Sequence, residues 1–126
     1  MAEILIIDDE PGILGVLRKI LEGAGHSVSE APDGEAALRH FEGSPSDLVI
    51  TDIFMPEMDG IEFLVHLRNT FPDARVLVMS GGGLLSRDQA LSDAALLGAD
   101  HILQKPFSRD QLLEAVDRVL ASGKDQ

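Results

Sequence analysis

The sequence contains no cysteine, tryptophan or tyrosine, and five phenylalanines are its only aromatic residues. Without cysteine there is no disulfide framework and no thiol chemistry. No run approaches the roughly 20 apolar residues that cross a bilayer. The first residues lack the basic segment and the long apolar stretch of a signal peptide. We therefore expect a cytoplasmic protein with no membrane-spanning segment.

Basic residues are also scarce: 10 Lys and Arg stand against 22 Asp and Glu, so the formal net charge is −12 with His neutral. Such a field repels nucleic-acid phosphates and anionic lipid headgroups. We therefore expect neither a nucleic acid nor a membrane as partner. The same field favours cationic partners and divalent metal ions.

The 126 residues do contain an alternation of short apolar runs and helical patterns, which fits one domain with one core. Short branched apolar runs are typical of strands buried on both faces of a parallel sheet. The runs lie at residues 4–7, 27–29 (weak), 48–50, 76–79 and 102–103. Apolar residues at helical spacing predict helices around residues 13–21, 36–41, 61–68, 91–97 and 112–120. This alternation predicts a doubly wound α/β domain of five strands and five helices.

Several residues are placed to begin or end these helices. Pro11 suits the first turn of the first helix, and Gly23 and Gly25 can end it. Asp59 and Ser108 are N-cap residue types, so we expect them to open the third and fifth helices.

Polar residues follow four of the five predicted strands. In open parallel sheets, sites form beyond the carboxyl ends of the strands, where the strand order reverses. In chain order, these residues are Asp8, Asp9 and Glu10, then Asp52, Ser80 and Lys105. We expect all but Glu10, a charged loop residue, to form one site at this edge.

The three aspartates of this set predict a metal site. Lys105 supplies one positive charge, so three carboxylates against it leave an excess of negative charge that suits Mg²⁺, with Mn²⁺ or Ca²⁺ as substitutes. We expect Asp9 and Asp52 to bind the ion directly and Asp8 to act through water. The backbone carbonyl of Phe54 is a further candidate ligand.

Asp52 is the predicted nucleophile. One of its carboxylate oxygens can attack an incoming phosphoryl group and form an acyl phosphate. Mg²⁺ and Lys105 would neutralise charge on the phosphoryl oxygens during the in-line displacement. The Ser80 hydroxyl could donate a hydrogen bond to one of those oxygens.

These residues lie in a series of motifs: ILIIDDE at 4–10, DLVITDIFMP at 47–56, MDG at 58–60, MSG at 79–81, LGAD at 97–100 and KPF at 105–107. In this order they make the whole chain, residues 1–126, resemble a bacterial response-regulator receiver domain of the single-domain, chemotaxis-regulator-like type. The resemblance implies a flavodoxin-like fold with strand order 2-1-3-4-5.

The resemblance also implies phosphoryl transfer to Asp52 from a sensor histidine kinase or a histidine phosphotransfer protein. It implies at most slow self-dephosphorylation rather than enzymatic turnover, and no attached output domain. A downstream protein target would bind the fourth helix, fifth strand and fifth helix. The chain would be a monomer or a weak dimer, and donors would dock near the first helix.

Three features depart from the family pattern or add to it. Ile102 stands where the family usually has Tyr or Phe, so an aromatic ring cannot couple phosphorylation to output. The Gly-rich segment 81–85 is a candidate for that role, because three glycines leave its backbone few steric limits. The bulky Phe54 could shield an acyl phosphate from water.

Three other functions compete with this interpretation. A phosphatase with an aspartyl-phosphate intermediate would need an acid/base Asp at the position of Phe54. A flavin-binding module would need a phosphate-binding loop instead of the acidic segment 8–10. A receiver-like interaction module that works without phosphorylation is consistent with Ile102.

Overall fold

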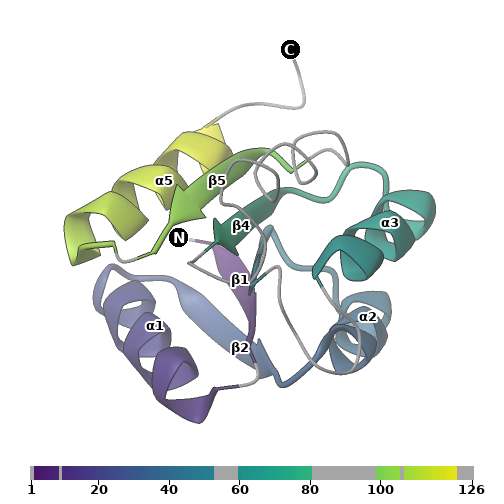
Figure 1. The fold of residues 1–126 in the computed structure, drawn as a ribbon, viewed down its shortest axis with the longest axis horizontal. Coiled ribbons are helices and arrows are strands. Elements are labelled where there is room, and N and C mark those ends of the chain that lie inside the picture. The colour runs from purple at the N-terminus through teal and green to yellow at the C-terminus, as the bar shows by residue number, and fades with distance from the viewer. Residues whose placement is uncertain (1, 9, 53–59, 81–98, 106, 122–126) are drawn as a thin grey trace.

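The computed structural model describes residues 2–8, 10–52, 60–80, 99–105 and 107–121. Five strands form one parallel sheet in the order β2-β1-β3-β4-β5 (Figure 1). The strands are β1 Glu3–Ile7, β2 Ser27–Ala31, β3 Leu48–Asp52, β4 Val76–Ser80 and β5 His101–Gln104. The predicted strand number, direction and order are therefore confirmed.

Four helices are described, and they cover both faces of the sheet (Figure 1). They are α1 Pro11–Gly23, α2 Gly34–Gly43, α3 Gly60–Thr70 and α5 Arg109–Ala121. Helices α1 and α5 pack on one face, and α2 and α3 pack on the other. The helix predicted around residues 91–97 lies outside the described residues.

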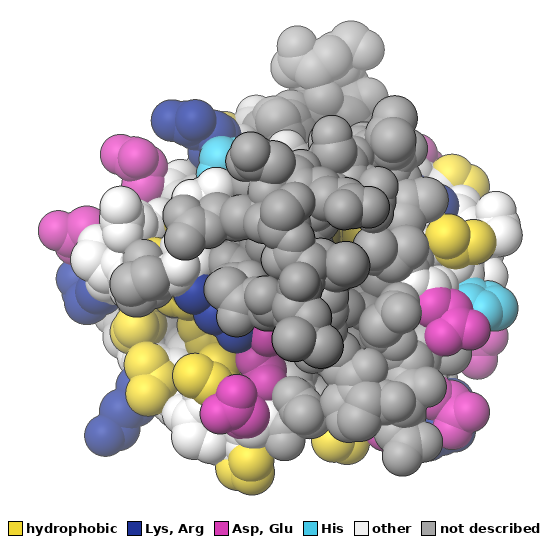
Figure 2. Space-filling model, in the orientation of Figure 1, with side chains coloured by type: hydrophobic (Ala, Val, Ile, Leu, Met, Phe, Trp, Pro, Cys, Tyr) yellow, Lys and Arg dark blue, Asp and Glu magenta, His cyan; other side chains and the backbone are white. Residues whose placement is uncertain are grey.

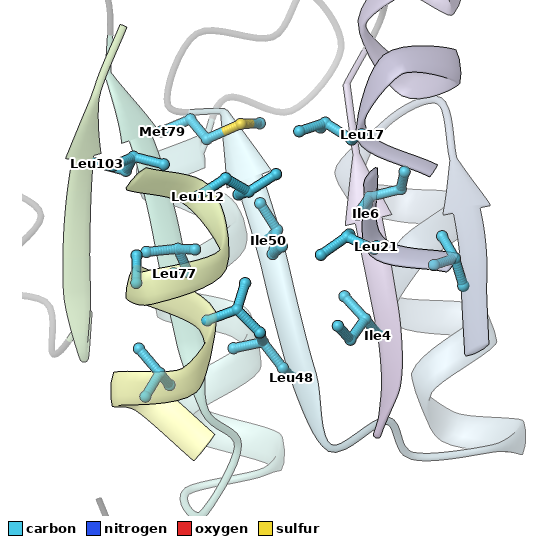
Figure 3. Close-up of a cluster of buried hydrophobic side chains, with 14 of the residues drawn as sticks. Ile4, Ile6, Leu17, Leu21, Leu48, Ile50, Leu77, Met79, Leu103 and Leu112 are labelled. Atoms are coloured by element: carbon cyan, nitrogen blue, oxygen red, sulfur yellow. The ribbon is translucent and has the colours of Figure 1, made fainter. Parts of the chain in front are cut away.

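The core has one apolar cluster on each face of the sheet. Successive strand residues point to opposite faces, so Ile4 and Ile6 join the α1 and α5 side whereas Leu5 and Ile7 join the α2 and α3 side. Figure 3 shows the first cluster, in which side chains of β1, β3 and β4 meet α1 and α5. Burial on both faces explains why the central strands are continuous apolar runs instead of alternating patterns.

Side-chain caps fix the start of two helices. Asp33 Oδ1 accepts a hydrogen bond from the Ala36 amide (2.8 Å) at the start of α2. At α5, Ser108 Oγ accepts from the Gln111 amide (3.1 Å), and Gln111 Oε1 accepts from the Ser108 amide (2.8 Å). This reciprocal pair is a capping box and confirms the cap predicted at Ser108. Asp59, the cap predicted for α3, lies outside the described residues.

The strand order reverses between β1 and β3, because the chain passes from β1 outward to β2 and then returns to the other side of β1. Carboxyl ends of parallel strands that flank such a reversal form the usual site of an open α/β sheet. Among the described residues, no helix is long and apolar enough to span a membrane.

Candidate functional site

Two buried carboxylates lie at the carboxyl ends of β1 and β3. Asp8 directly follows β1 and is 1 % exposed, and Asp52 is the last residue of β3 and is 8 % exposed. The apolar run covers residues 48–50 and the sequence predicts Asp52 just after the strand, but the strand itself includes Thr51 and Asp52. Pairing with both neighbours extends it, since Thr51 pairs with Ile7 and Asp52 pairs with Met79.

Backbone contacts hold Asp8 in place. Its amide donates to the carbonyl of Ala31 at the end of β2 (3.3 Å), and its Oδ1 accepts from the amide of Glu10 (3.0 Å). The Glu10 side chain is exposed. Glu10 therefore contributes to the site through its backbone, a contact that the type of side chain does not predict.

Lys105 completes the described part of the site. Its Nζ donates to Asp52 Oδ2 at 2.6 Å and lies 3.9 Å from Asp8 Oδ2. Lys105 follows β5, which is two strands from β3, and neighbouring strands lie about 4.8 Å apart. The four-carbon stem of a lysine spans this distance past the end of β4. A charge-assisted hydrogen bond between buried or half-buried groups is stronger than one between neutral groups.

The structure thus brings Asp8, Asp52 and Lys105 together as predicted. Ser80 is the last residue of β4 and pairs with Gln104, so its backbone lies at the same edge of the sheet. The Ser80 side chain, Asp9 and Phe54 lie outside what the structure describes. Their predicted roles therefore stay predictions.

The described donor set fits a small divalent cation. Two carboxylates face one ammonium, which leaves an excess of negative charge in a largely buried position. Mg²⁺ prefers oxygen ligands and commonly uses one or two carboxylates, with waters and phosphate oxygens completing its shell. Among the described residues, no group of three or more His, Cys, Asp or Glu side chains is arranged to hold a metal. Asp8 and Asp52 are the carboxylates that would serve one.

Ile102 lies in the middle of β5, where it pairs with Val78. Its side chain is half-buried against the cluster on the α2 and α3 face of the sheet. The position therefore carries an aliphatic side chain that is packed against the core.

Comparison with known proteins gives concordant matches. The sequence pattern of the response regulator receiver domain matches residues 4–117. Response regulator MprA of Mycolicibacterium vanbaalenii is 37 % identical over 117 residues, which cover 93 % of this chain and 49 % of that protein. Response regulator GtcR of Aneurinibacillus migulanus is 39 % identical over 118 residues, which cover 94 % of this chain and 46 % of that protein. The chain spans about half the length of these relatives.

Solved structures agree with this assignment. The receiver domain of NtrX from Brucella abortus superposes with a TM-score of 0.89 at 30 % identity, covering 95 % of this chain and 99 % of that one. Chemotaxis protein CheY4 of Vibrio cholerae superposes with a TM-score of 0.85 at 30 % identity, covering 94 % of this chain and 98 % of that one. This chain belongs to the response regulator receiver domain family, whose members act in two-component signalling.

Proposed function

We propose that Asp52 accepts a phosphoryl group from a phosphohistidine of a sensor histidine kinase or a histidine phosphotransfer protein. The observation that carries this proposal is the 2.6 Å contact between Lys105 Nζ and Asp52 Oδ2 at the reversal point of the sheet. It places a cation on the proposed nucleophile at the edge where open α/β sheets bind ligands.

In the proposed step, a carboxylate oxygen of Asp52 attacks phosphorus. The P–N bond to the donor histidine breaks, its electron pair stays on the ring nitrogen, and a P–O bond forms on Asp52. Asp52 and Asp9 would hold Mg²⁺ directly, and the bound ion would supply positive charge that offsets the charge of the phosphoryl oxygens. Lys105 pairs with the carboxylate before transfer and with a phosphoryl oxygen after it. Ser80 would donate to another phosphoryl oxygen, and Asp9, Asp8 and the Phe54 carbonyl would complete the metal site.

The surface beside the site suits a protein donor. Helix α1 starts at Pro11, shortly after Asp8 in the chain. Hydrophobic side chains gather over this helix in Figure 2, and Val16 of α1 is 57 % exposed. We place donor docking near this helix, and target binding on the fourth predicted helix, β5 and α5. The protein acts in the cytoplasm as a monomer or weak dimer.

Acetyl phosphate tests the central step without a kinase. Incubated with acetyl phosphate and Mg²⁺, the protein should gain the mass of one phosphoryl group, in an adduct that is stable to acid and labile to base. Asp52→Asn should abolish the adduct, because an amide lacks the nucleophilic carboxylate oxygen. The matched control is Asp73→Asn, which removes the same charge at an exposed position and should leave the adduct unchanged.

A receiver-like module that signals without phosphorylation is the second candidate, and the observation that favours it is the packed aliphatic Ile102. The two candidates differ in one result. If no adduct forms, or if it persists in Asp52→Asn, the proposal that Asp52 accepts a phosphoryl group is contradicted. The interaction module would then be the remaining candidate. Slow decay of an Asp52-dependent adduct would support a phosphoacceptor that is not a turnover enzyme.

A further inference from the structure

The open edge of strand β2 carries a feature that phosphoryl acceptance does not use. Among the strands that the structure describes, β2 is outermost, and its only paired side is the one that faces β1. The Ser27 amide donates to Ala2, and the Ala31 carbonyl accepts from Asp8. In a parallel pair, alternate residues bond to the same neighbour. Val28 and Glu30 therefore turn their amides and carbonyls to the outer edge.

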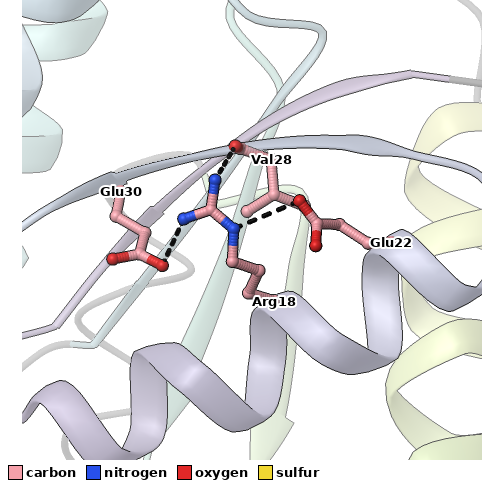
Figure 4. A network of polar contacts seen from close by, with 4 residues as sticks. All are labelled: Arg18, Glu22, Val28 and Glu30. Carbon is pink, nitrogen blue, oxygen red and sulfur yellow. Dashed lines mark hydrogen bonds and ion pairs between the residues drawn. The ribbon is translucent and has the colours of Figure 1, made fainter.

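Arg18 of α1 reaches over this edge. Its Nη2 donates to the carbonyl of Val28 (2.9 Å), its Nη1 pairs with Glu30 Oε2 (2.5 Å), and its Nε donates to Glu22 Oε2 (3.1 Å), as Figure 4 shows. One guanidinium thus holds an outward carbonyl of the strand and the side chain two residues later. The hydrogen bond to Glu30, followed by that to Glu22, raises the pKa of Arg18 above its ordinary value.

Exposed strand edges are templates for pairing with another chain, and proteins block them with charged residues. We propose that Arg18 closes the outer edge of β2 and so prevents two copies of this chain from joining their sheets through that strand. The occupant that the edge fits is a second copy, because β2 can pair with itself about a twofold axis.

The geometry of that pairing follows from the ladder. An antiparallel pair centred on Ser29 places Val28 opposite Glu30 of the second copy. Residues opposite each other with outward backbone groups exchange both hydrogen bonds, so the symmetric pair would make four. The Val28 carbonyl accepts in two of these, one in each copy, and that is the group on which Arg18 donates. A twofold contact of this kind closes on itself, so the product is a dimer and not a fibre.

The test compares two variants of the full chain that remove one arginine each. Arg18→Met keeps the apolar stem but loses the guanidinium. Arg39→Met is the matched control, because Arg39 pairs with Glu35 on the exposed side of α2 and its loss changes the net charge by the same amount. Sedimentation velocity over a wide concentration range should show dimers of Arg18→Met with a Kd at least about tenfold below that of Arg39→Met, as expected when two hydrogen bonds become available.

A second substitution locates the contact. Glu30→Pro removes an outward amide, and proline is tolerated on a strand edge whose N–H faces solvent. Arg18→Met with Glu30→Pro should therefore return to the monomer. Arg18→Lys is measured in parallel, because lysine keeps the charge without the planar fork. It should dimerise more weakly than Arg18→Met, and it carries the test if circular dichroism shows Arg18→Met to be unfolded.

Two results would overturn the proposal. One is a folded Arg18 variant whose Kd equals that of Arg39→Met. The other is dimerisation that Glu30→Pro leaves unchanged, since the copies would then meet through another surface. Both results are independent of whether Asp52 accepts a phosphoryl group, because no phosphoryl donor is present.

Discussion

At the scale of single residues, the ion pair between Lys105 and Asp52 is the central feature of this domain. Lys105 is the one cation that the structure describes in contact with the two buried carboxylates. Charge that develops on transferred phosphoryl oxygens is best stabilised by preorganised groups of opposite sign. The position of Lys105 at the end of β5 supplies such a group before any ligand arrives.

Lys105→Met should therefore slow phosphorylation by acetyl phosphate on the order of 100-fold, the usual loss when one stabilising donor is removed. Methionine keeps most of the apolar stem and removes the ammonium. The measurement is the adduct fraction over time by intact mass. Lys19→Met, at an exposed position on α1, is the control and should react at the wild-type rate. An unchanged rate in Lys105→Met would show that Lys105 does not stabilise the transferred group.

The sequence predicted the three residues of this site because each one follows a short apolar run, and parallel strands bring their carboxyl ends to one edge. It could not predict that the Glu10 amide donates to Asp8 Oδ1, because a backbone N–H is common to all residues except proline and its partner does not depend on the side chain. The Arg18 contacts also escaped prediction. They join α1 to β2 across the turn between them, and such distances depend on packing rather than on spacing.

At the scale of elements, apolar runs located the strands but shortened them. β3 and β4 each end on a polar residue, Asp52 and Ser80, that continues the ladder. The sequence pattern of β2 is weak because it is an edge strand with serines and a glutamate. Its pairing with β1 defines the strand. Asp33 was missed as the cap of α2, because apolar spacing begins only at Ala36. Tertiary pairing and local caps therefore set the boundaries that periodicity leaves open.

Ser108 was predicted as the N-cap of α5 from its residue type. The capping box implies that its side chain contributes measurably to the stability of the protein. Ser108→Ala removes the acceptor of the Gln111 amide and should lower the free energy of unfolding by about 1 kcal/mol, the typical cost of losing an N-cap. Urea unfolding followed by circular dichroism measures this, because the chain has no tryptophan to report by fluorescence. Ser44→Ala is the control at an exposed position after α2 and should stay within about 0.5 kcal/mol of wild type. If the two variants had equal free energies of unfolding, the capping box would contribute nothing to stability.

At the scale of the whole molecule, core packing and net charge have opposite effects on the stability of the folded state. Apolar clusters on both faces fix the sheet, and with it the ends of β1, β3 and β5 that carry the charged groups. The formal net charge of −12 acts against the compact state through self-repulsion. Acidic side chains lie around the outline of the face in Figure 2. A divalent cation at the carboxylate site would therefore relieve local repulsion and also add binding free energy to folding.

This linkage predicts that Mg²⁺ stabilises the protein through Asp8 and Asp52. A ligand that binds only the folded state adds RT ln(1 + [L]/Kd), about 2.7 kcal/mol when its concentration is 100 times Kd. Thermal unfolding by circular dichroism, with NaCl exchanged for MgCl₂ at constant ionic strength, should show a rise in Tm. Constant ionic strength is essential, because any salt screens the net charge. Asp52→Asn should lose most of the rise, whereas Asp73→Asn should keep it. If the Tm of Asp52→Asn rose with Mg²⁺ as much as that of the wild type, the ion would be acting on the overall negative charge and not at the site.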